Sequence, residues 1–313
     1  MYFLFTKNLH LQLKLSLNTV EKVEGRKCKG YNLQGGVKLK RLLFILILFG
    51  LLISSLKTQN FYEVSDTQIH FLNTGNSDCI FIQSDKNILI DAAENDDESY
   101  IIQYLRRLGI KKLDYVLSTH PHADHIGSLD AIIKEFPISE LLICEGTNTT
   151  KEYKDFMNAI DMVGGEPQYP YENRILNLGQ NVTLKLMNCI LPNTSDKNDW
   201  SIVSELVAGG KKILLMADAQ MKTEDNLMHQ FKQVDVLKAG HHGDITSSSE
   251  EFINKIKPKN VIITTGENPY GHPSPIVLDR FNDINATVYR TDVDGTIICD
   301  ILEGKDIVIK TED

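Results

Sequence analysis

The stretch Ser118-Thr119-His120-Pro121-His122-Ala123-Asp124-His125 restricts what this chain can fold into more than any other, because it places three imidazoles and a carboxylate within six residues. The run that precedes it, residues 113–118, has the length and apolar content of a short buried β-strand. A strand that leads into a loop rich in potential ligands gives that loop a rigid support. The sequence therefore predicts a metal site at the end of a strand.

The spacing within this stretch indicates two metal ions. His120 and His122 are two residues apart, so on an extended chain their side chains point to the same face. Asp124 and His125 follow after a turn and can serve a second position nearby. Imidazole and carboxylate ligands suit zinc, with manganese or iron as alternatives. The competing interpretation, a chance cluster of histidines in a polar loop, requires this restrictive spacing to be accidental.

Length and charge narrow the class of protein. A chain of 313 residues can form one large domain or two halves of one fold. Residues 1–60 carry 10 of the 33 Lys and Arg residues and only 2 of the 42 Asp and Glu residues, so residues 61–313 have 23 basic and 40 acidic residues, a net charge of −17. This charge disfavours nucleic acid as a partner, although two metal cations can dominate the field locally.

The five cysteines, Cys28, Cys79, Cys144, Cys189 and Cys299, form no Cys-x-x-Cys pair. The last four lie within apolar runs, which is typical of buried free thiols. We therefore expect no disulfide framework.

An apolar run near the N-terminus predicts contact with a membrane. Lys38-Leu39-Lys40-Arg41 precedes residues 42–56, a run interrupted only by small residues. A basic flank before such a run is typical of a signal peptide or a short signal anchor, and a buried core helix is the competing interpretation. No clear small-x-small cleavage site follows, which favours an uncleaved anchor. The basic flank places the remainder outside the cytoplasmic membrane, or secreted if the leader is cleaved.

We expect four segments: a basic extension over residues 1–41, the anchor or signal segment over 42–56, a linker over 57–65 and one α/β domain over 66–313. Residues 1–36 are also compatible with a misassigned translation start. Within the domain, expected strands cover residues 69–72, 79–82, 87–91, 113–118, 138–144, 182–191, 200–207, 211–218, 234–239, 260–265, 286–290, 295–301 and 306–310. Expected helices cover residues 99–109, 127–136, 151–162, 221–231, 249–256 and 276–281. Residues 166–180, with two prolines, are expected to form a loop at the midpoint.

The His-x-His-x-Asp-His signature resembles that of the metallo-β-lactamase superfamily, over about residues 66–310. Within it the chain most resembles the ComEC-type hydrolases, which are related to the metallo-hydrolase domain of the competence DNA-uptake channel, and it is similar to the teichoic-acid phosphorylcholine esterases. The segments that carry this resemblance are Phe71-Leu72-Asn73-Thr74-Gly75-Asn76-Ser77-Asp78, Gly240-His241-His242-Gly243 and Tyr270-Gly271-His272-Pro273. The resemblance implies an αββα sandwich with two divalent metals, most often zinc, along one edge of two sheets.

Two aspartates that end apolar runs gain roles from this resemblance. Asp218 takes the position of the carboxylate that bridges both metals, with a cap for the following helix as the alternative. Asp91 takes the position of a carboxylate that supports the metal loop by hydrogen bonding, with a turn or helix cap as the alternative.

The adjacent histidines His241 and His242 provide a further source of ligands. The resemblance implies that one binds the second metal while the other acts on the substrate as an acid or hydrogen-bond donor. We assign His242 as the ligand and His241 as the donor, although the sequence does not separate them. Where the relatives usually have Ser, this chain has Asp244, which adds negative charge near the site.

Other pocket residues follow from the same resemblance. His272 is expected to contact the leaving group, with a turn histidine as the alternative, and Tyr270 is expected to line the pocket. Many relatives have a third histidine between the first loop and the bridging carboxylate, but residues 126–217 contain none. The ComEC-type group likewise lacks it and has a polar residue near the position of Asp199 or Ser201. The first metal then keeps an open position, which fits catalysis.

The metal site predicts metal-assisted hydrolysis outside the cytoplasmic membrane, with Asp124 orienting or deprotonating the attacking water. The resemblance to phosphodiesterase-like relatives implies that the bond hydrolysed is a phosphodiester. A small-molecule or cell-envelope phosphodiester fits the acidic body better than nucleic acid does. The alternatives are an extracellular nuclease or DNA-uptake factor, and a non-catalytic anchored accessory protein.

Overall fold

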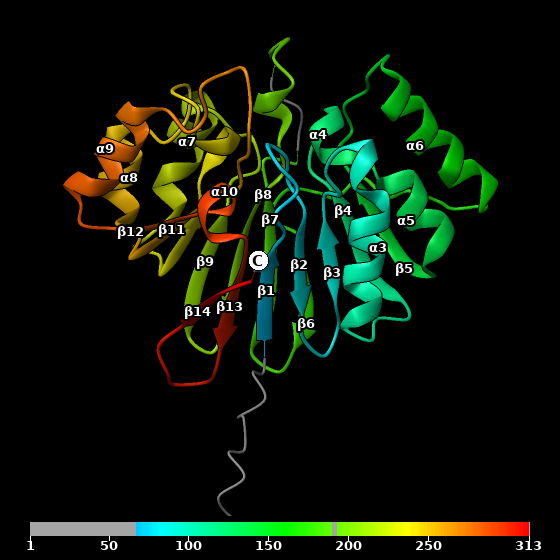
Figure 1. The fold of residues 1–313 in the computed structure, drawn as a ribbon, viewed down its shortest axis with the longest axis horizontal. Coiled ribbons are helices and arrows are strands. Elements are labelled where there is room, and N and C mark those ends of the chain that lie inside the picture. Colours follow the sequence, from blue (N-terminus) through cyan, green and yellow to red (C-terminus); the bar gives the residue numbers. More distant parts are fainter. Residues whose placement is uncertain (1–66, 190–192, 313) are drawn as a thin grey trace, which may run out of the picture. The chain divides into compact units, whose positions relative to one another are not determined.

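The computed structural model describes residues 67–189 and 193–312 (Figure 1). The predicted extension, anchor segment and linker lie outside these residues, so they stay predictions. Within the described ranges, no helix combines the length and the apolar character that a membrane crossing requires.

The described residues form two seven-stranded mixed sheets and the helices that cover them. The strand orders are β14-β13-β1-β2-β3-β4-β5 and β12-β11-β10-β9-β8-β7-β6. The strands of the first sheet are β1 (Thr67–Phe71), β2 (Ile80–Gln83), β3 (Ile88–Ile90), β4 (Leu113–Ser118), β5 (Ile138–Ile143), β13 (Thr296–Ile301) and β14 (Val308–Glu312). Those of the second are β6 (Ile175–Gly179), β7 (Val182–Met187), β8 (Val203–Ala208), β9 (Lys211–Leu215), β10 (Val236–Lys238), β11 (Asn260–Ile263) and β12 (Thr287–Arg290).

Helices follow the strands in both halves of the chain. They are α3 (Glu98–Arg107), α4 (Ala123–Ile126), α5 (Leu129–Glu135), α6 (Lys151–Met162), α7 (Met221–Leu227), α8 (Glu250–Ile256), α9 (Pro275–Asp283) and α10 (Thr291–Asp294). Short 3-10 turns cover Asn95–Asp97, Asn198–Trp200, Met228–Gln230 and Gly240–Gly243.

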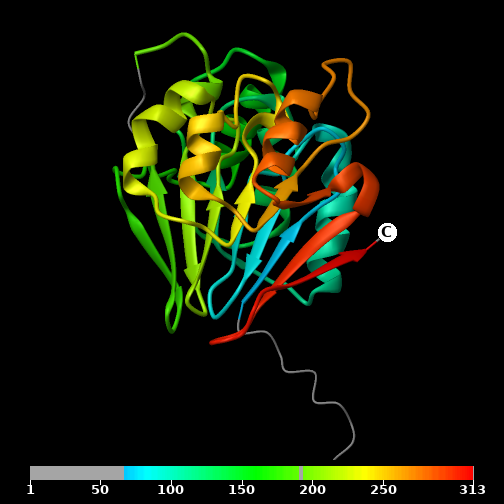
Figure 2. The same cartoon turned by 90° about the vertical axis from the view of Figure 1, so that its left-hand side faces the viewer.

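Three apolar clusters hold the layers together. The first lies between the sheets and joins residues such as Phe71 of β1 and Leu215 of β9. The second packs α3, α5 and α6 against the first sheet, and the third packs α7, α8 and α9 against the second, as Figure 2 shows for the yellow to orange helices. This is the helix–sheet–sheet–helix order that the sequence resemblance predicts.

Most predicted elements are confirmed, but residues 166–180 are not wholly a loop. They contain β6, an edge strand that pairs antiparallel with β7. Leu176 and Leu178 point into the core while Ile175 and Asn177 are exposed, a period-2 pattern that the nearby prolines obscured.

The helix predicted over residues 127–136 is also different. The chain forms the one-turn helix α4 first, and α5 begins only at Leu129. The predicted strands over 182–191 and 200–207 are shorter than expected, and α10 was not predicted. The four described cysteines are buried and free, as expected.

Candidate metal centre

The first histidines of the site lie where β4 ends. The chain leaves β4 at Ser118, passes through His120 and His122, and turns into α4, which carries Asp124 and His125. His120 and His125 are fully buried, whereas His122 and Asp124 face a cavity. One short segment therefore supplies four potential ligands from a fixed strand end.

Asp218 follows β9 and lies between two groups of these ligands. Its Oδ2 lies 3.8 Å from His120 Nε2. Its Oδ1 lies 3.2 Å from His125 Nε2 and 3.5 Å from His242 Nε2. The two oxygens of one carboxylate thus face different sides, which is the geometry of a bridging ligand.

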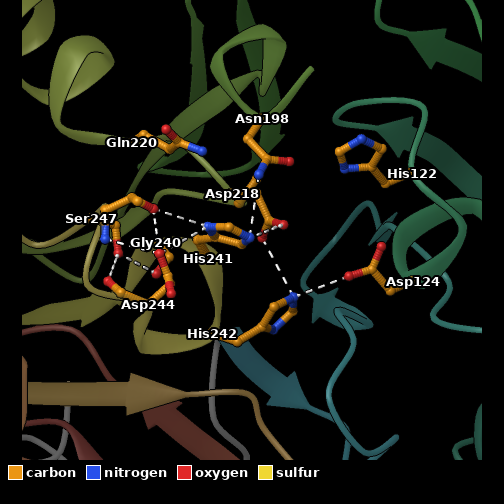
Figure 3. A network of polar contacts seen from close by, with 12 residues as sticks. His122, Asp124, Asn198, Asp218, Gln220, Gly240, His241, His242, Asp244 and Ser247 are labelled. Carbon is orange, nitrogen blue, oxygen red and sulfur yellow. Dashed lines mark hydrogen bonds and ion pairs between the residues drawn. The ribbon is translucent and has the colours of Figure 1, made fainter. Parts of the chain in front are cut away.

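We name these the first ligand group, formed by His120, His122 and Asp218, and the second ligand group, formed by Asp124, His125, His242 and Asp218. Within each group the candidate ligand atoms all lie within 4.8 Å of one another. In Figure 3 the His242 imidazole points toward both Asp124 and Asp218, with His242 Nε2 3.3 Å from Asp124 Oδ2.

Three buried atoms of the second ligand group make no hydrogen bond: His125 Nε2, Asp218 Oδ1 and His242 Nε2. A buried polar atom without a partner costs about 1–3 kcal/mol, so three that converge require an explanation. A divalent cation bound among them provides one, and nitrogen and carboxylate donors suit such a cation. The donor set therefore fits the predicted metal.

Hydrogen bonds on the far side of two imidazoles leave these Nε2 atoms free to bind. His125 Nδ1 lies 2.7 Å from Asp91 Oδ2 and His242 Nδ1 lies 2.9 Å from the Thr264 carbonyl oxygen. Because both partners accept, each Nδ1 carries a proton, and the Nε2 of the neutral imidazole offers its lone pair to the second ligand group. Asp91 also accepts from the Thr119 amide at 2.8 Å and hydroxyl at 2.7 Å, so it lies where the predicted support of the metal loop requires it.

The charges of the site oppose the effects of burial. Burial disfavours the imidazolium form of His125, but the surrounding carboxylates, led by Asp218, raise its pKa well above the usual value. The pKa of His242 is raised in the same way. Burial likewise opposes ionisation of Asp124 and Asp218, yet the histidines lower both pKa values below the usual range. Metal binding here displaces protons from imidazoles.

The structure separates the two adjacent histidines. His242 is buried and belongs to the second ligand group, whereas His241 is partly exposed to the cavity, 3.9 Å from Asp218 Oδ2. The His241 ring nitrogens lie 3.2 Å from Asn198 Nδ2 and 3.3 Å from Thr246 Oγ1. Both histidines have positive φ, +50° and +53°, which is uncommon outside glycine and is found at functional sites.

The remaining predicted residues divide into two sets. His272 Nε2 lies 3.0 Å from Asp244 Oδ2, and the Tyr270 ring stacks on His272 at 5.5 Å between centroids. All three face a cavity of about 850 Å³. The cavity is lined by Asn76, Glu94, His122, Ala123, Asp124, Asn148, Thr150, Asn198, Asp218, His241, His242, Asp244, Glu267, Asn268, Pro269, Tyr270 and His272.

Ser201 and Asp199 differ in position. Ser201 Oγ lies 3.4 Å from His120 Nδ1 and accepts a hydrogen bond from the Asp218 backbone amide at 3.2 Å. It therefore contacts two members of the first ligand group. Asp199 is buried, accepts from the Thr223 hydroxyl at 3.4 Å and does not line the cavity. Its neighbour Asn198 faces the cavity instead, and only its polar character in the sequence could have indicated this.

A family profile described as the Metallo-beta-lactamase superfamily matches residues 72–266. The chain belongs to the metallo-β-lactamase superfamily. As a member of it, the chain has two mixed sheets and candidate metal-binding residue groups at the site that its signature predicts.

Its relatives in this superfamily include competence proteins. The chain is 32% identical over 203 residues to ComE operon protein 3 of Bacillus subtilis, covering 64% of this chain and 26% of that protein. It is 27% identical over 206 residues to Competence protein ComA of Neisseria gonorrhoeae, covering 63% of this chain and 26% of that protein. The chain thus spans about a quarter of the length of these relatives.

The fold also matches CmlA, a diiron β-hydroxylase from Streptomyces venezuelae, with a TM-score of 0.50 and 12% identity, covering 79% of this chain and 54% of that one. At this identity the likeness shows the fold alone.

Proposed function

We propose that this chain is a metal-dependent phosphodiesterase in which two divalent metal ions activate water. Zinc is the metal that we propose for both positions. The observation that carries the proposal is the position of Asp218, whose two oxygens face two separate groups of imidazoles. A pair of ions that shares one carboxylate suits the in-line displacement of a phosphodiester.

Two bound ions would lower the pKa of water and offset charge on a phosphoryl oxygen. The protein contributes orientation and proton transfer. Asp124 faces the cavity, and the neighbouring histidines lower its pKa, which favours a carboxylate that orients the attacking water. In the alternative role, the same carboxylate accepts the proton of that water. His241 and His272 line the same cavity and present imidazoles that can protonate the leaving oxygen, and Asp244 holds the His272 ring in place.

The charge of the cavity supports a small or cell-envelope phosphodiester as the substrate. Among the described residues that line it, none is Lys or Arg, while Glu94, Asp244 and Glu267 add carboxylates beyond the ligand groups. Polyanionic nucleic acid is normally held by several Lys and Arg contacts along its backbone. Action outside the membrane, with residues 42–56 as an anchor or cleaved signal, belongs to the same proposal.

A second candidate function is a nuclease or DNA-uptake factor, which the names of the competence relatives favour. A third, a non-catalytic accessory protein, is disfavoured because the buried imidazole and carboxylate atoms of the second ligand group have no other partner. Zinc has competitors too, since manganese or iron can occupy the same kind of site.

The first test measures bound metal per chain together with hydrolysis of bis(p-nitrophenyl) phosphate. We expect close to two ions in the wild type, and loss of at least one ion and of ~10³-fold or more of the activity in Asp218→Ala. Asp306→Ala is the matched control, because Asp306 is exposed and forms a surface ion pair with Lys211. A metal-free, inactive wild type after zinc, manganese and iron have each been added back would rule the proposal out.

The same preparation separates the substrates. A single-stranded oligonucleotide and a polyol phosphate polymer are compared at equal phosphodiester concentration. The proposal expects the larger kcat/KM for the polyol phosphate. Faster cleavage of the oligonucleotide, with a steep loss at higher salt, would favour the nuclease instead.

A further inference from the structure

Lys238 is a charged residue inside the sandwich. It is the last residue of β10 and its side chain is fully buried. Val236, two residues earlier, packs between the sheets, so Lys238 points into the same space. Across residues 67–189 and 193–312 no other lysine or arginine is buried. Burying an ammonium group costs free energy, so Lys238 requires a charged partner and hydrogen-bond acceptors inside the sandwich.

The partner of Lys238 comes from the other sheet. Its Nζ forms an ion pair with Asp78 Oδ2, from the loop between β1 and β2, and donates to the Ala217 carbonyl oxygen at 3.1 Å. Asp78 also accepts a hydrogen bond from the Thr264 hydroxyl through Oδ1. The two contacts of the Asp78 carboxylate join segments that are 160 or more residues apart in the sequence.

Each of these contacts leads directly to the second ligand group. Ala217 precedes Asp218 and has a φ of +47°, and the bond from Lys238 holds that backbone. Thr264, which donates to Asp78, accepts the Nδ1 proton of His242 through its carbonyl oxygen.

The backbone of Asp78 reaches the other ligands. Its amide donates to the Asp124 carbonyl oxygen at 3.0 Å, and its carbonyl oxygen accepts from the Ala93 amide at 2.8 Å. The Asp78 carboxylate lies 4.0 Å from His125 Nδ1.

We infer that the Lys238–Asp78 pair positions the second ligand group and sets its affinity for metal. Asp78, Asp91 and His125 also lie close enough together to suggest a metal group of their own. The Asp78 carboxylate, however, is already taken by the Lys238 ammonium and the Thr264 hydroxyl, so it acts on the metal through other residues. The inference rests on the metal site of the proposed function and not on its substrate.

The test titrates Zn²⁺ into the metal-free full-length chain, in two backgrounds that each keep one ligand group. His122→Ala leaves the second ligand group as the better site, and His242→Ala leaves the first. We expect Lys238→Met to raise the dissociation constant about 10–100-fold in the His122→Ala background and to change it less than threefold in the His242→Ala background.

A merely structural role predicts a different result for the double variant Asp78→Asn with Lys238→Met. Removing both charges avoids an unpaired buried charge, so thermal stability lost in either single variant should largely return. We expect weak zinc binding at the second ligand group to persist in that double variant. The same variant provides the measurement if a single variant does not fold. Return of both stability and metal affinity would overturn the inference.

The pair formed by Arg174 and Glu140 provides the matched control, because it is partly buried and neither residue belongs to a ligand group. Glu140→Gln should lower thermal stability without changing either dissociation constant. A wild-type chain that takes up no metal would reject the proposed function itself, whereas equal affinities in wild type and variants would reject only the role of the Lys238–Asp78 pair.

Discussion

At the scale of single residues, Asp91 is the carboxylate whose effect on the metal is most direct without being a ligand. It holds the Nδ1 proton of His125 at 2.7 Å, and its own φ of +57° is a backbone region that Asn also tolerates. Asp91→Asn should therefore keep the fold and weaken metal binding at the second ligand group about 10–100-fold, because the imidazole loses an anionic partner. Titration of the metal-free protein with Zn²⁺ measures this.

Asp114→Asn is a suitable control for that measurement. Asp114 lies on β4, the strand that leads into the metal loop, and accepts hydrogen bonds from the Asn87 backbone amide and from Lys112. It should leave the zinc dissociation constant unchanged. Equal zinc affinity in Asp91→Asn and wild type would show that the contact to His125 does not govern metal binding.

The residue scale also shows what the sequence could and could not reveal about the site. His120, His122 and His125 lie within six residues of one another, so their spacing alone predicts a metal site with two positions. Asp218 and His242 needed the family resemblance as well, because nothing local joins them to that stretch. The Lys238–Asp78 pair was missed, since it forms only when two distant segments meet between the sheets. A lysine inside an apolar strand was its single available signal.

At the scale of elements, the contact between α4 and the segment after β3 depends on one glycine. A Cβ on Gly127 would lie 2.5 Å from the Asn95 amide nitrogen and 2.7 Å from the Ala93 carbonyl oxygen, both backbone atoms. Gly127 has helical φ and ψ, so alanine is excluded by space and not by conformation. Gly127→Ala should cost about 1–3 kcal/mol of unfolding free energy, because the backbone must shift.

The shift should also weaken metal binding, because α4 carries Asp124 and His125. Urea unfolding and zinc titration measure the two effects together. Gly165→Ala is the control, since its new Cβ would lie nearest a side chain, Ile160 Cγ2 at 3.2 Å, which can move. Comparable losses in both variants would mean that the backbone contact at α4 has no special importance.

Elements were predictable where a strand has a clear apolar run and a polar end, as β4 and β9 do. They were not predictable where local signals compete. The edge strand β6 has only two inward residues, and α4 is a single turn that lies inside the ligand motif. In both cases the structure is determined by strand pairing and packing with distant residues, which a local sequence pattern does not reveal.

At the scale of the whole molecule, the order of the strands was beyond the sequence alone. The first strand pairs with β13, with Thr67 opposite Ile301, and a pairing of such separation leaves no local trace. The family resemblance predicted the layered architecture, and the periodicity of the apolar residues predicted an α/β domain. Local patterns therefore specify individual strands and helices, while long-range burial determines how these elements combine into two sheets.

Global stability should depend on pH through His70. This histidine lies in β1 and belongs to neither ligand group. Burial lowers its pKa to about 4, although Asp300 acts in the opposite direction. Its Nδ1 lies 2.8 Å from the Tyr104 hydroxyl. In the unfolded chain His70 takes up a proton near pH 6.5, whereas in the folded chain it stays neutral until about pH 4. The unfolded state therefore binds more protons in this window, and stability falls as the pH falls through it.

The contribution of this one group at pH 5 amounts to about 2 kcal/mol of unfolding free energy relative to pH 7.5. His70→Asn keeps a polar atom near the Tyr104 hydroxyl and removes the titration, so the decrease in stability between these pH values should be smaller by about that amount. Urea unfolding of wild type and variant at both pH values gives the difference, in which the other titrating groups cancel. If the two proteins lose stability in parallel, then His70 is already protonated in the folded state, and the pH dependence must come from the carboxylates and imidazoles of the metal centre.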